Sequence, residues 1–442
     1  MNDLAEQLFL DALEASSPYR LTKEALDELK SGKALKGSRE VYLVATGKAS
    51  VEMARAVRAG LSGRLAGGIV VTSYETDKKW EGITLLKASH PVPDETSVEA
   101  GRKVKAFIEG IPPDAAALFC ISGGTSSLLC LPGEGITVEE LSETFRLLNN
   151  SGATIGEMNA VRKHLSAVKG GQLLRSFDPG VTLIDLLISD VPDDDPAVIG
   201  SGPTTPDIST YQDSYHVLLE YGLWEKVPAS VRNRVEQGID GIVPDTVKPG
   251  EDPVKNHSQR VIGSARKLAV TAAKLAEEEG YNTWVDDSAY NDDVEEVASR
   301  IGEIALGVAV DQEIEPEEPP EFHTDIDRPA ALLFYGESTV QVTGEGKGGR
   351  NQELALRGAS HIRGQEKITW LSAGTDGVDG PTDAAGAVVD GLTIRKAREK
   401  GIHPNMYLDN NDSYHFHEKM GTLLKTGPTG NNLMDLQVII ID

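Results

Sequence analysis

Residues 115–127 read AAALFCISGGTSS, an apolar run that ends abruptly in glycines and hydroxyl side chains. Ala115–Ile121 is predicted to be a strand buried on both faces, because it offers no charged residue to water. The turn that follows, Ser122–Ser127, has the composition of a strand-to-helix connection. In open parallel sheets such connections lie at the carboxyl edge, where ligands bind. The stretch therefore predicts an α/β domain with a site at this strand end.

The same alternation of short apolar runs and helical stretches continues along the chain. Val41–Thr46 and Val181–Ile188 are further predicted strands, followed by Gly47-Lys48 and by Ser189-Asp190. Helices are predicted over Glu95–Ile111 and Glu157–Val168. Apolar strands separated by helices indicate a parallel sheet that is covered on both faces.

A change of composition near Ile239–Asn256, where Gly, Pro, Asp and Lys are frequent, indicates a domain boundary. We therefore predict two domains, residues 1–240 and residues 241–442. The expected fold class is α/β: an N-terminal Rossmann-like parallel sheet, a C-terminal mixed α/β domain and an active-site cleft between them. Within the second domain we predict a solvated acidic loop at Asp311–Glu321 and a strand at Val340–Val342.

Composition excludes several classes of protein. The chain has 442 residues, 43 Lys and Arg against 69 Asp and Glu, and a formal net charge of -26. Charge of this sign repels nucleic acid and anionic membranes. No apolar run approaches the about 18 residues that a membrane span needs. The acidic start is unlike a secretory leader, and Cys120 and Cys130 lie in apolar surroundings, so we expect a reduced, cytoplasmic protein.

Three glycine-containing segments are candidates for anion binding. Ser122–Ser127 would offer backbone N–H groups and hydroxyls to an anion, although a plain strand-to-helix turn explains it as well. Lys48 stands at a predicted helix start, where its charge opposes the helix dipole unless a phosphate or carboxylate binds; a solvated lysine is the alternative. Gly344–Gly349 matches G-x-G-x-x-G, a weak signal alone, and Lys347 and Arg350 there suit phosphate oxygens.

Acidic residues cluster in two places. Asp190 and Asp193 to Asp195 follow a predicted buried strand, where a divalent cation would relieve their repulsion; an acidic turn is equally compatible. Asp376, Asp379 and Asp383 resemble a cation-binding loop, or side chains that cap a tight turn.

Basic residues are scarce, so the predicted helix Glu157–Val168 stands out. It places Arg162 near Ser166 and the following Lys169, a cationic patch able to attract an anionic substrate. Pairing with surface acids is the alternative. His90, after a predicted strand, is either a site residue or a packed loop residue.

Taken together, the motifs resemble the glycerate kinases that make 2-phosphoglycerate, the family whose C-terminal half is called the MOFRL domain. The resemblance runs in family order along nearly the whole chain. It departs from the family at Tyr414 to His417 and at Asn431-Asn432. The matching segments are Ala45–Ser50, His90–Glu95, Ile121–Leu128, Asn159–Ser166, Ser189–Pro196, Gly200–Thr204, Gly336–Thr339, Gly344–Glu353, Ser372–Asp383 and Thr426–Asn432.

This resemblance implies ATP-dependent phosphorylation of the C2 hydroxyl of D-glycerate, giving 2-phosphoglycerate and ADP. The implied cofactors are ATP and Mg²⁺ or another divalent cation, and the implied partners are these small molecules alone, with the chain a monomer or homodimer. The resemblance points to Lys48 and Arg350 as the charges at the transferring phosphate.

The other roles are assigned from chemistry. Asp190 would accept the hydroxyl proton or hold the metal together with Asp193. Because Lys48 and Arg350 fall in different predicted domains, we expect catalysis to require closure. The remaining candidate substrate and phosphate contacts are Ser122, Gly123, Gly124, Thr125, Ser126, Arg162, Lys347, Gly348, Gly349 and Asp376.

Two other functions stay open at this point. The first is an NAD(P)-dependent hydroxypyruvate reductase, supported only by the G-x-G-x-x-G match. The second is a non-catalytic sugar-acid-binding protein on the same frame, which would give no reason for charged residues in both domains.

Overall fold

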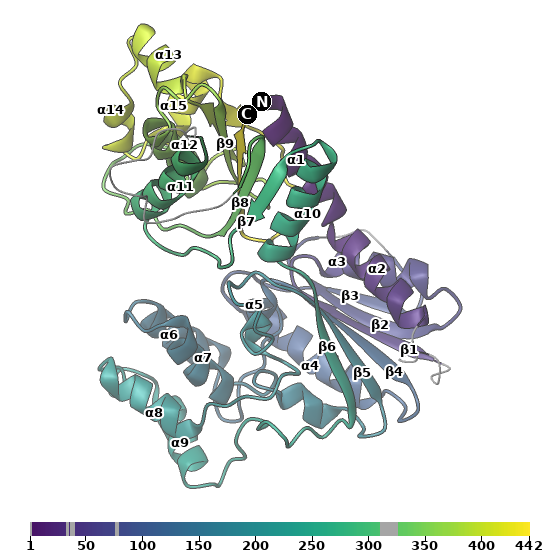
Figure 1. The fold of residues 1–442 in the computed structure, drawn as a ribbon. Coiled ribbons are helices and arrows are strands. Elements are labelled where there is room, and N and C mark those ends of the chain that lie inside the picture. The colour runs from purple at the N-terminus through teal and green to yellow at the C-terminus, as the bar shows by residue number, and fades with distance from the viewer. Residues whose placement is uncertain (1, 32–34, 36–39, 76–78, 310–325) are drawn as a thin grey trace. The chain divides into compact units, whose positions relative to one another are not determined.

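The computed structural model describes residues 2–31, 35, 40–75, 79–309 and 326–442. The predicted acidic loop Asp311–Glu321 lies outside these residues. The chain folds as two compact units, each with its own sheet (Figure 1). The N-terminal unit is Pro18–Ile262, and the C-terminal unit joins Met1–Ser17 to Gly263–Asp442.

The N-terminal unit contains a sheet with the strand order β3-β2-β1-β4-β5-β6. The pairs β1–β2, β2–β3, β1–β4 and β4–β5 are parallel. Its elements in chain order are α2 (Pro18–Ser31), β1 (Val41–Thr46), α3 (Ser50–Gly60), β2 (Leu65–Thr72), β3 (Ile83–Lys87), α4 (Glu95–Glu109), β4 (Ala116–Ile121), α5 (Thr125–Leu128), α6 (Val138–Asn149), α7 (Ile155–His164), η1 (Gln172–Ser176), β5 (Thr182–Ile188), η2 (Ile199–Ser201), α8 (Tyr211–Glu220), α9 (Ala229–Ile239) and β6 (Asn256–Gly263).

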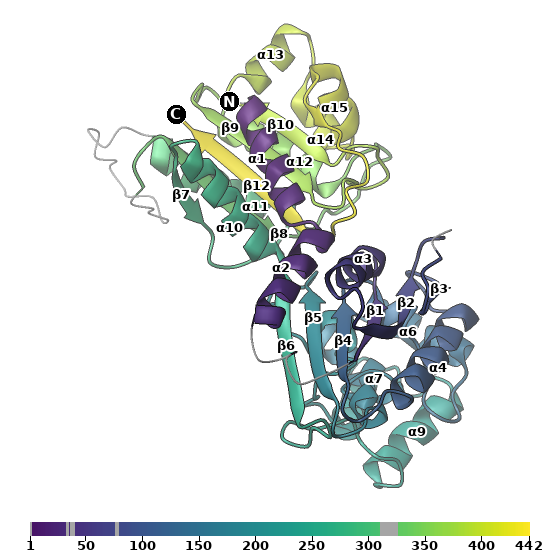
Figure 2. The ribbon, with the colours of Figure 1, turned by 90° about the vertical axis from the view of Figure 1, so that its right-hand side faces the viewer.

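Strand β4 lies at the centre of this sheet, and all of its residues are buried. Helices α2 and α3 lie on one face of the sheet and α4 on the other (Figure 2). Phe119 and Val44 belong to the apolar core beneath α4. A strand covered on both faces needs apolar side chains at every position, which explains the unbroken apolar run.

The strand order reverses direction between β1 and β4. From β1 the chain runs outward to β2 and β3, and it then returns to β4 and continues to β5 on the other side. This is the predicted Rossmann-like arrangement, and it is confirmed. The carboxyl ends of β1 and β4 therefore flank the crevice in which such sheets bind ligands.

The C-terminal unit has a mixed sheet with the order β11-β10-β9-β12-β8-β7. Helices α1 and α10 lie on one face, and α11 and α12 on the other (Figure 1). Its elements are α1 (Asn2–Ala15), α10 (Ala265–Glu278), β7 (Asn282–Val285), α11 (Val294–Ala309), β8 (Ala330–Gly336), α12 (Arg350–His361), β9 (Ile368–Gly374), β10 (Gly386–Asp390), α13 (Thr393–Glu399), α14 (Pro404–Leu408), α15 (Ser413–Met420), β11 (Leu423–Leu424) and β12 (Asp435–Ile441).

Strand β12 runs antiparallel between β8 and β9. Its first residue, Asp435, pairs with Gly336 at the end of β8 and with Gly374 at the end of β9. An acidic side chain therefore lies where two strands end, at the edge from which Arg350 begins α12. The predicted mixed α/β architecture of this half is confirmed.

The two units divide the chain differently from the predicted ranges 1–240 and 241–442. Strand β6 pairs with β5 and so belongs to the N-terminal sheet. Helix α1 contacts α10, β9 and β12, and it buries Leu8, Phe9 and Ala12 in the C-terminal unit. Both differences arise from contacts between residues far apart in sequence, which local composition does not record.

One predicted strand is wrong. Residues 340–342 form no strand, and the Val342 side chain is 75% exposed. Short apolar runs are ambiguous signals, and here the β-branched residues lie in a loop. Among the described residues, none of the helices has both the length and the apolar composition that crossing a bilayer requires.

Strand β6 is attached to β5 by a buried polar cluster. The Asp185 carboxylate, near the middle of β5, accepts hydrogen bonds from Thr204 Oγ1 at 2.6 Å and Gln259 Nε2 at 2.8 Å. His257 Nε2 lies 2.9 Å from Asp185, and its Nδ1 lies 2.8 Å from Asp252. Burial alone would lower the pKa of His257, but the two carboxylates outweigh burial and raise this pKa to about 9.

We therefore expect the protein to lose stability in mildly alkaline solution. The folded state holds the His257 proton up to about pH 9, whereas the reference pKa of the side chain is 6.5. The stabilisation is thus fully present below pH 6.5 and is lost as the pH rises through about 9. His257→Gln should lower the free energy of unfolding by about 1–3 kcal/mol at pH 6.5, measured by urea unfolding.

The control is His216→Gln, which removes an exposed histidine from α8. It should retain the wild-type dependence of stability on pH between 6.5 and 9. An unchanged slope in His257→Gln over that interval would show that this histidine does not carry the effect.

Candidate functional site

The turns after β1 and β4 are bonded to each other. The Lys48 N–H donates to the Gly123 carbonyl at 2.8 Å, and the Ala49 N–H donates to Ser122 Oγ at 3.1 Å. The predicted residues Lys48 and Ser122–Ser127 therefore lie together at the reversal point of the sheet.

The Ser122–Ser127 turn contains backbone N–H groups that could bind a ligand. Ser122, Thr125 and Ser127 use their N–H groups within the turn or toward β1. Across the part of the chain that the structure describes, the N–H groups of Gly123, Gly124 and Ser126 make no hydrogen bond. Several unpaired N–H groups in one turn form a concavity suited to anionic oxygens.

Two titratable groups interact electrostatically with Lys48. Asp190, at the end of β5, has its pKa raised by burial, and the positive charge of Lys48 opposes this shift. Burial and then Lys48 lower the pKa of His90, whose Nε2 lies 3.2 Å from the position that a Cβ on Gly124 would take. The sequence left the role of His90 open; the structure places it beside the turn.

Lys169 was predicted only as part of a cationic patch with Arg162, without a role of its own in the site. Its side chain is fully buried, and Nζ donates to the Ser126 carbonyl at 2.5 Å and to Ser126 Oγ at 2.8 Å. A buried lysine without a carboxylate partner is the signal that would have identified it, but this signal depends on the fold.

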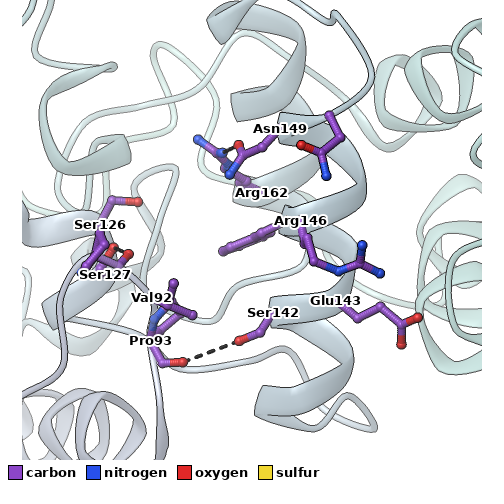
Figure 3. Close-up of a pocket in the computed structure, with 12 residues that line it drawn as sticks. Val92, Pro93, Ser126, Ser127, Ser142, Glu143, Arg146, Asn149 and Arg162 are labelled. Carbon is purple, nitrogen blue, oxygen red and sulfur yellow. Dashed lines mark hydrogen bonds between the residues drawn. The ribbon is translucent and has the colours of Figure 1, made fainter. Parts of the chain in front are cut away.

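Arg162 lines a pocket of about 650 Å³ in the N-terminal unit (Figure 3). Ser126 and Ser127 lie on one side of the pocket, and residues of α6 lie on the other. Arg162 donates to Asn149 Oδ1 at 2.6 Å. The alternative prediction was that this arginine pairs with a surface acid. Among the described residues, no acid is paired with Arg162.

The two aspartates predicted to hold a metal differ in environment. Asp190 is partly buried, whereas Asp193 is exposed. Within the described residues, no three His, Cys, Asp or Glu side chains are grouped to hold a metal ion. Carboxylate oxygens are the ligands that Mg²⁺ prefers, so Asp190 could supply one such ligand.

Arg350, in the C-terminal unit, is paired with two carboxylates. Its Nε and Nη2 bond to Asp435 at 2.5 and 2.9 Å, and Nη2 also bonds to Glu337 at 3.0 Å. Burial raises the pKa of the Asp435 carboxyl, and Arg350 opposes this shift. Nη1 makes no hydrogen bond with the residues described, so one edge of the guanidinium remains available.

The Gly344–Gly349 loop does not offer most of its N–H groups to a ligand. Those of Gly344, Glu345, Gly346 and Lys347 already bond to residues 410–412. These four backbone N–H groups are therefore not available to an anion. Gly348 and Gly349 are the exceptions within the described chain, and the Lys347 ammonium lies 4.2 Å from the centre of the Tyr414 ring.

In the predicted cation-binding loop, Asp376 and Asp379 accept hydrogen bonds from backbone N–H groups. Asp376 accepts the Val378 N–H at 3.0 Å, which closes a tight turn. Asp379 accepts the first N–H groups of α12, from Asn351 at 3.1 Å and Gln352 at 2.9 Å. Burial raises the pKa of Asp379 to about 6. Capping accounts for both residues.

The site predictions thus fall into two groups. In the N-terminal unit, Lys48, Asp190 and Ser122–Ser127 are brought together. Arg350 gathers with Asp435 and Glu337 in the C-terminal unit. The expected meeting of Lys48 with Arg350 stays a prediction, because they belong to different units.

Two family models match the chain. Residues 4–236 match a domain of unknown function, DUF4147, and residues 330–435 match the MOFRL family. A protein of Thermotoga maritima named D-glycerate 2-kinase is 38% identical over 442 residues, covering 100% of this chain and 98% of that protein. The chain belongs to the glycerate kinase family.

A solved structure also resembles this member of the glycerate kinase family. The crystal structure of glycerate kinase from Thermotoga maritima has a TM-score of 0.87 and 38% identity, and the match covers 100% of this chain and 99% of that one. A protein of Agrobacterium vitis, provisionally named a hydroxypyruvate reductase, is 39% identical over 401 residues, or 90% of this chain and 86% of that protein.

The site of this glycerate kinase family member depends on a glycine. Gly47 has φ of 115°, and a Cβ there would lie 2.2 Å from Ser122 Oγ and 2.5 Å from the Ser122 carbonyl oxygen. Gly47→Ala should therefore lower the free energy of unfolding by about 1–3 kcal/mol, measured by thermal or urea unfolding.

Gly63→Ala is the matched control, because Gly63 also has positive φ, 82°, but its Cβ would meet no atom within 4 Å. The difference between the two variants isolates the overlap with Ser122. Equal stability of the two would contradict the close approach of the β1 and β4 turns.

Proposed function

We propose that this chain transfers the γ-phosphoryl group of ATP to the C2 hydroxyl of D-glycerate, giving 2-phosphoglycerate and ADP. The observation that carries the proposal is Lys48 beside the unpaired N–H groups of Gly123 and Gly124, at the reversal point of a parallel sheet. Relatives named glycerate kinase, matched over the full chain, support the same assignment.

Lys48 and the Ser122–Ser127 turn would bind the transferring phosphoryl group. Phosphoryl transfer needs positioning and charge neutralisation more than covalent help from the protein. An ammonium and fixed N–H groups supply both, since they face the oxygens on which charge accumulates. No ion pair joins Lys48 to another described residue, so its charge is not already neutralised.

Asp190 would receive the proton of the substrate hydroxyl. In the step, the C2 oxygen forms a bond to the γ-phosphorus, and the bond from that phosphorus to the bridging oxygen of ADP breaks. The bonding electron pair leaves with ADP, and the hydroxyl proton passes to the Asp190 carboxylate. Burial raises the pKa of this carboxyl, which makes it a better proton acceptor than an exposed aspartate.

The alternative role for Asp190, with Asp193 assisting, is to hold a magnesium ion, which neutralises the phosphates of ATP when bound. Arg350 would stabilise charge on the transferring group with the edge that Asp435 and Glu337 leave available. We further propose a cytoplasmic monomer or homodimer; its two cysteines, buried and without a disulfide, are compatible with a reducing compartment.

A hydroxypyruvate reductase is the second candidate, because two relatives from Agrobacterium vitis carry that provisional name. Its support in the sequence was G-x-G-x-x-G at Gly344–Gly349, which must follow a strand to bind a dinucleotide. Residues 340–342 form no strand, and the N–H groups of Gly344 and Gly346 are already bonded. These observations favour the kinase.

The test measures both reactions with the same preparation. With D-glycerate, ATP and Mg²⁺, we expect ADP to form, and enolase alone should convert the product. A 3-phosphoglycerate product would require added phosphoglycerate mutase and would overturn the C2 assignment. With hydroxypyruvate and NADH or NADPH we expect no fall in absorbance at the nicotinamide band; oxidation of the nicotinamide without ADP formation would establish the reductase instead.

Removing either proposed charge should slow the chemistry. Lys48→Ala and Arg350→Ala are each expected to lower kcat by about 100-fold or more, on the scale of preorganised charges. Steady-state kinetics with saturating D-glycerate and ATP measure the effect. Exposed residues provide the controls, Lys103→Ala on α4 and Arg395→Ala on α13, which should retain wild-type kcat. Full activity in Lys48→Ala or Arg350→Ala rejects that residue's role.

A further inference from the structure

The pocket beside the Ser122–Ser127 turn contains a cation without an acidic partner. Arg162 extends from α7, and its Nη2 donates to Asn149 Oδ1 at 2.6 Å and approaches Met158 Sδ at 3.8 Å. The guanidinium carbon lies 5.3 Å from the centre of the Phe145 ring. Nε is buried and has no hydrogen-bond partner. All of these neighbours are neutral.

Two other partly buried arginines of the chain are paired with acids, whereas Arg232 donates to the backbone carbonyls of Trp224 and Val227. Arg350 binds Asp435 and Glu337, and Arg357 binds Glu353 at 2.8 Å. A chain with a net charge of -26 has acids in excess, so an unpaired arginine is not due to a shortage of partners. Removing a guanidinium from water without a counter-charge is costly, and burial lowers the pKa of Arg162 accordingly.

A second buried cation lies close to the first. Lys169 is 1% exposed, and its two bonded partners are the carbonyl oxygen and Oγ of Ser126. Burial lowers the pKa of Lys169 to about 8, Cys130 opposes this, and the positive charge of Arg162 lowers it further. The two cations thus repel each other, and neither has a carboxylate partner among the described residues.

The bond to Lys169 determines what the Ser126 hydroxyl can do. An ammonium has donors and no acceptor, so Ser126 Oγ must accept from it. The hydroxyl hydrogen then remains available for Ser201 Oγ at 3.0 Å or for an acceptor in the pocket that Ser126 lines. An anion in this pocket would accept from Ser126 and neutralise both cations.

We propose that Arg162 and the Ser126 hydroxyl bind the carboxylate of the substrate, and that Lys169 is a positioning residue that orients this hydroxyl. The assignment rests on the proposed function for the identity of the substrate. A guanidinium matches a carboxylate in shape and in number of donors.

The turn itself explains why the carboxylate is assigned here. Gly123 bonds to the Lys48 backbone, and Ser126, three residues further along, lines the Arg162 pocket. In glycerate the carboxylate carbon is bonded directly to C2. A carboxylate held at the Ser126 end would therefore direct the C2 hydroxyl toward Gly123 and Lys48, where the phosphoryl group is proposed to bind.

The kinetic test separates this subsite from the ATP site. Arg162→Gln should raise KM for D-glycerate by about 10- to 100-fold, the value of a lost charge-assisted contact, and leave KM for ATP within about twofold. Arg162→Lys, which keeps the charge, should lie between wild type and Arg162→Gln. Arg175→Gln, an exposed arginine in η1, is the control and should match wild type.

The positioning role of Lys169 is tested by whether its substitution changes KM for D-glycerate or kcat. Lys169→Met should raise KM for D-glycerate more than it changes kcat, and Lys169→Arg, which can still donate to Ser126, should partly restore it. A purely structural lysine would instead reduce the amount of active enzyme and lower kcat at unchanged KM; that outcome overturns the positioning role.

Binding without turnover gives an independent measurement. D-glycerate alone should raise Tm of the wild type and of Arg175→Gln, and glycerol, which lacks the carboxylate, should not. Arg162→Gln should fold with a normal Tm in buffer and lose the shift with D-glycerate. This measurement needs no ATP. A Tm shift of the wild type with D-glycerate, together with no ADP formation, would refute the kinase activity and leave the subsite intact.

Two results would overturn the subsite itself. One is an unchanged KM for D-glycerate in both Arg162→Gln and Arg162→Lys while the wild type phosphorylates D-glycerate. The other is a raised KM for ATP with an unchanged KM for D-glycerate, because Arg162 would then bind a phosphate.

Discussion

The hydrogen bond from the Lys48 N–H to the Gly123 carbonyl is the interaction on which the site of the N-terminal unit depends. It joins the ends of β1 and β4 at the one place where the sheet reverses its order. The bond forms because Gly47 has no side chain to separate the two turns. Once the turns are joined, the Lys48 side chain and the unpaired N–H groups of Gly123 and Gly124 are placed together, and Asp190 completes the group from the next strand.

Most buried charge in both units is paired, but two cations of the N-terminal unit are not. In the C-terminal unit, Arg350 lies between Asp435 and Glu337 and needs no further counter-ion for stability. In the N-terminal unit, Arg162 and Lys169 are buried beside neutral groups only. Natural proteins retain such uncompensated charge chiefly at functional sites, where a ligand supplies the balance. The distribution of unpaired cations therefore identifies the binding surface more sharply than the glycine-rich motifs do.

Local sequence patterns predicted the strands whose composition follows directly from burial on both faces. The strand at Val41–Thr46 was predicted to the residue, and Ala115–Ile121 to within one residue, because strands covered on both faces are apolar throughout. The placement of β6 was missed because it depends on His257 reaching Asp185 across the sheet. Lys169 was predicted as part of a cationic patch, but its contact with Ser126 was not, because its sequence neighbours do not reveal its burial.

The crossing of helix α1 into the C-terminal unit has a consequence for synthesis on the ribosome. Leu8 and Phe9 are synthesised before α10 and strands β9 and β12, which cover them and follow only after residue 264. The apolar surface of Leu8 and Phe9 therefore has no native partners while the entire N-terminal unit is translated and folds. Chaperones could bind the apolar face of α1 during this interval, and its native contacts are complete only after β12 has been translated.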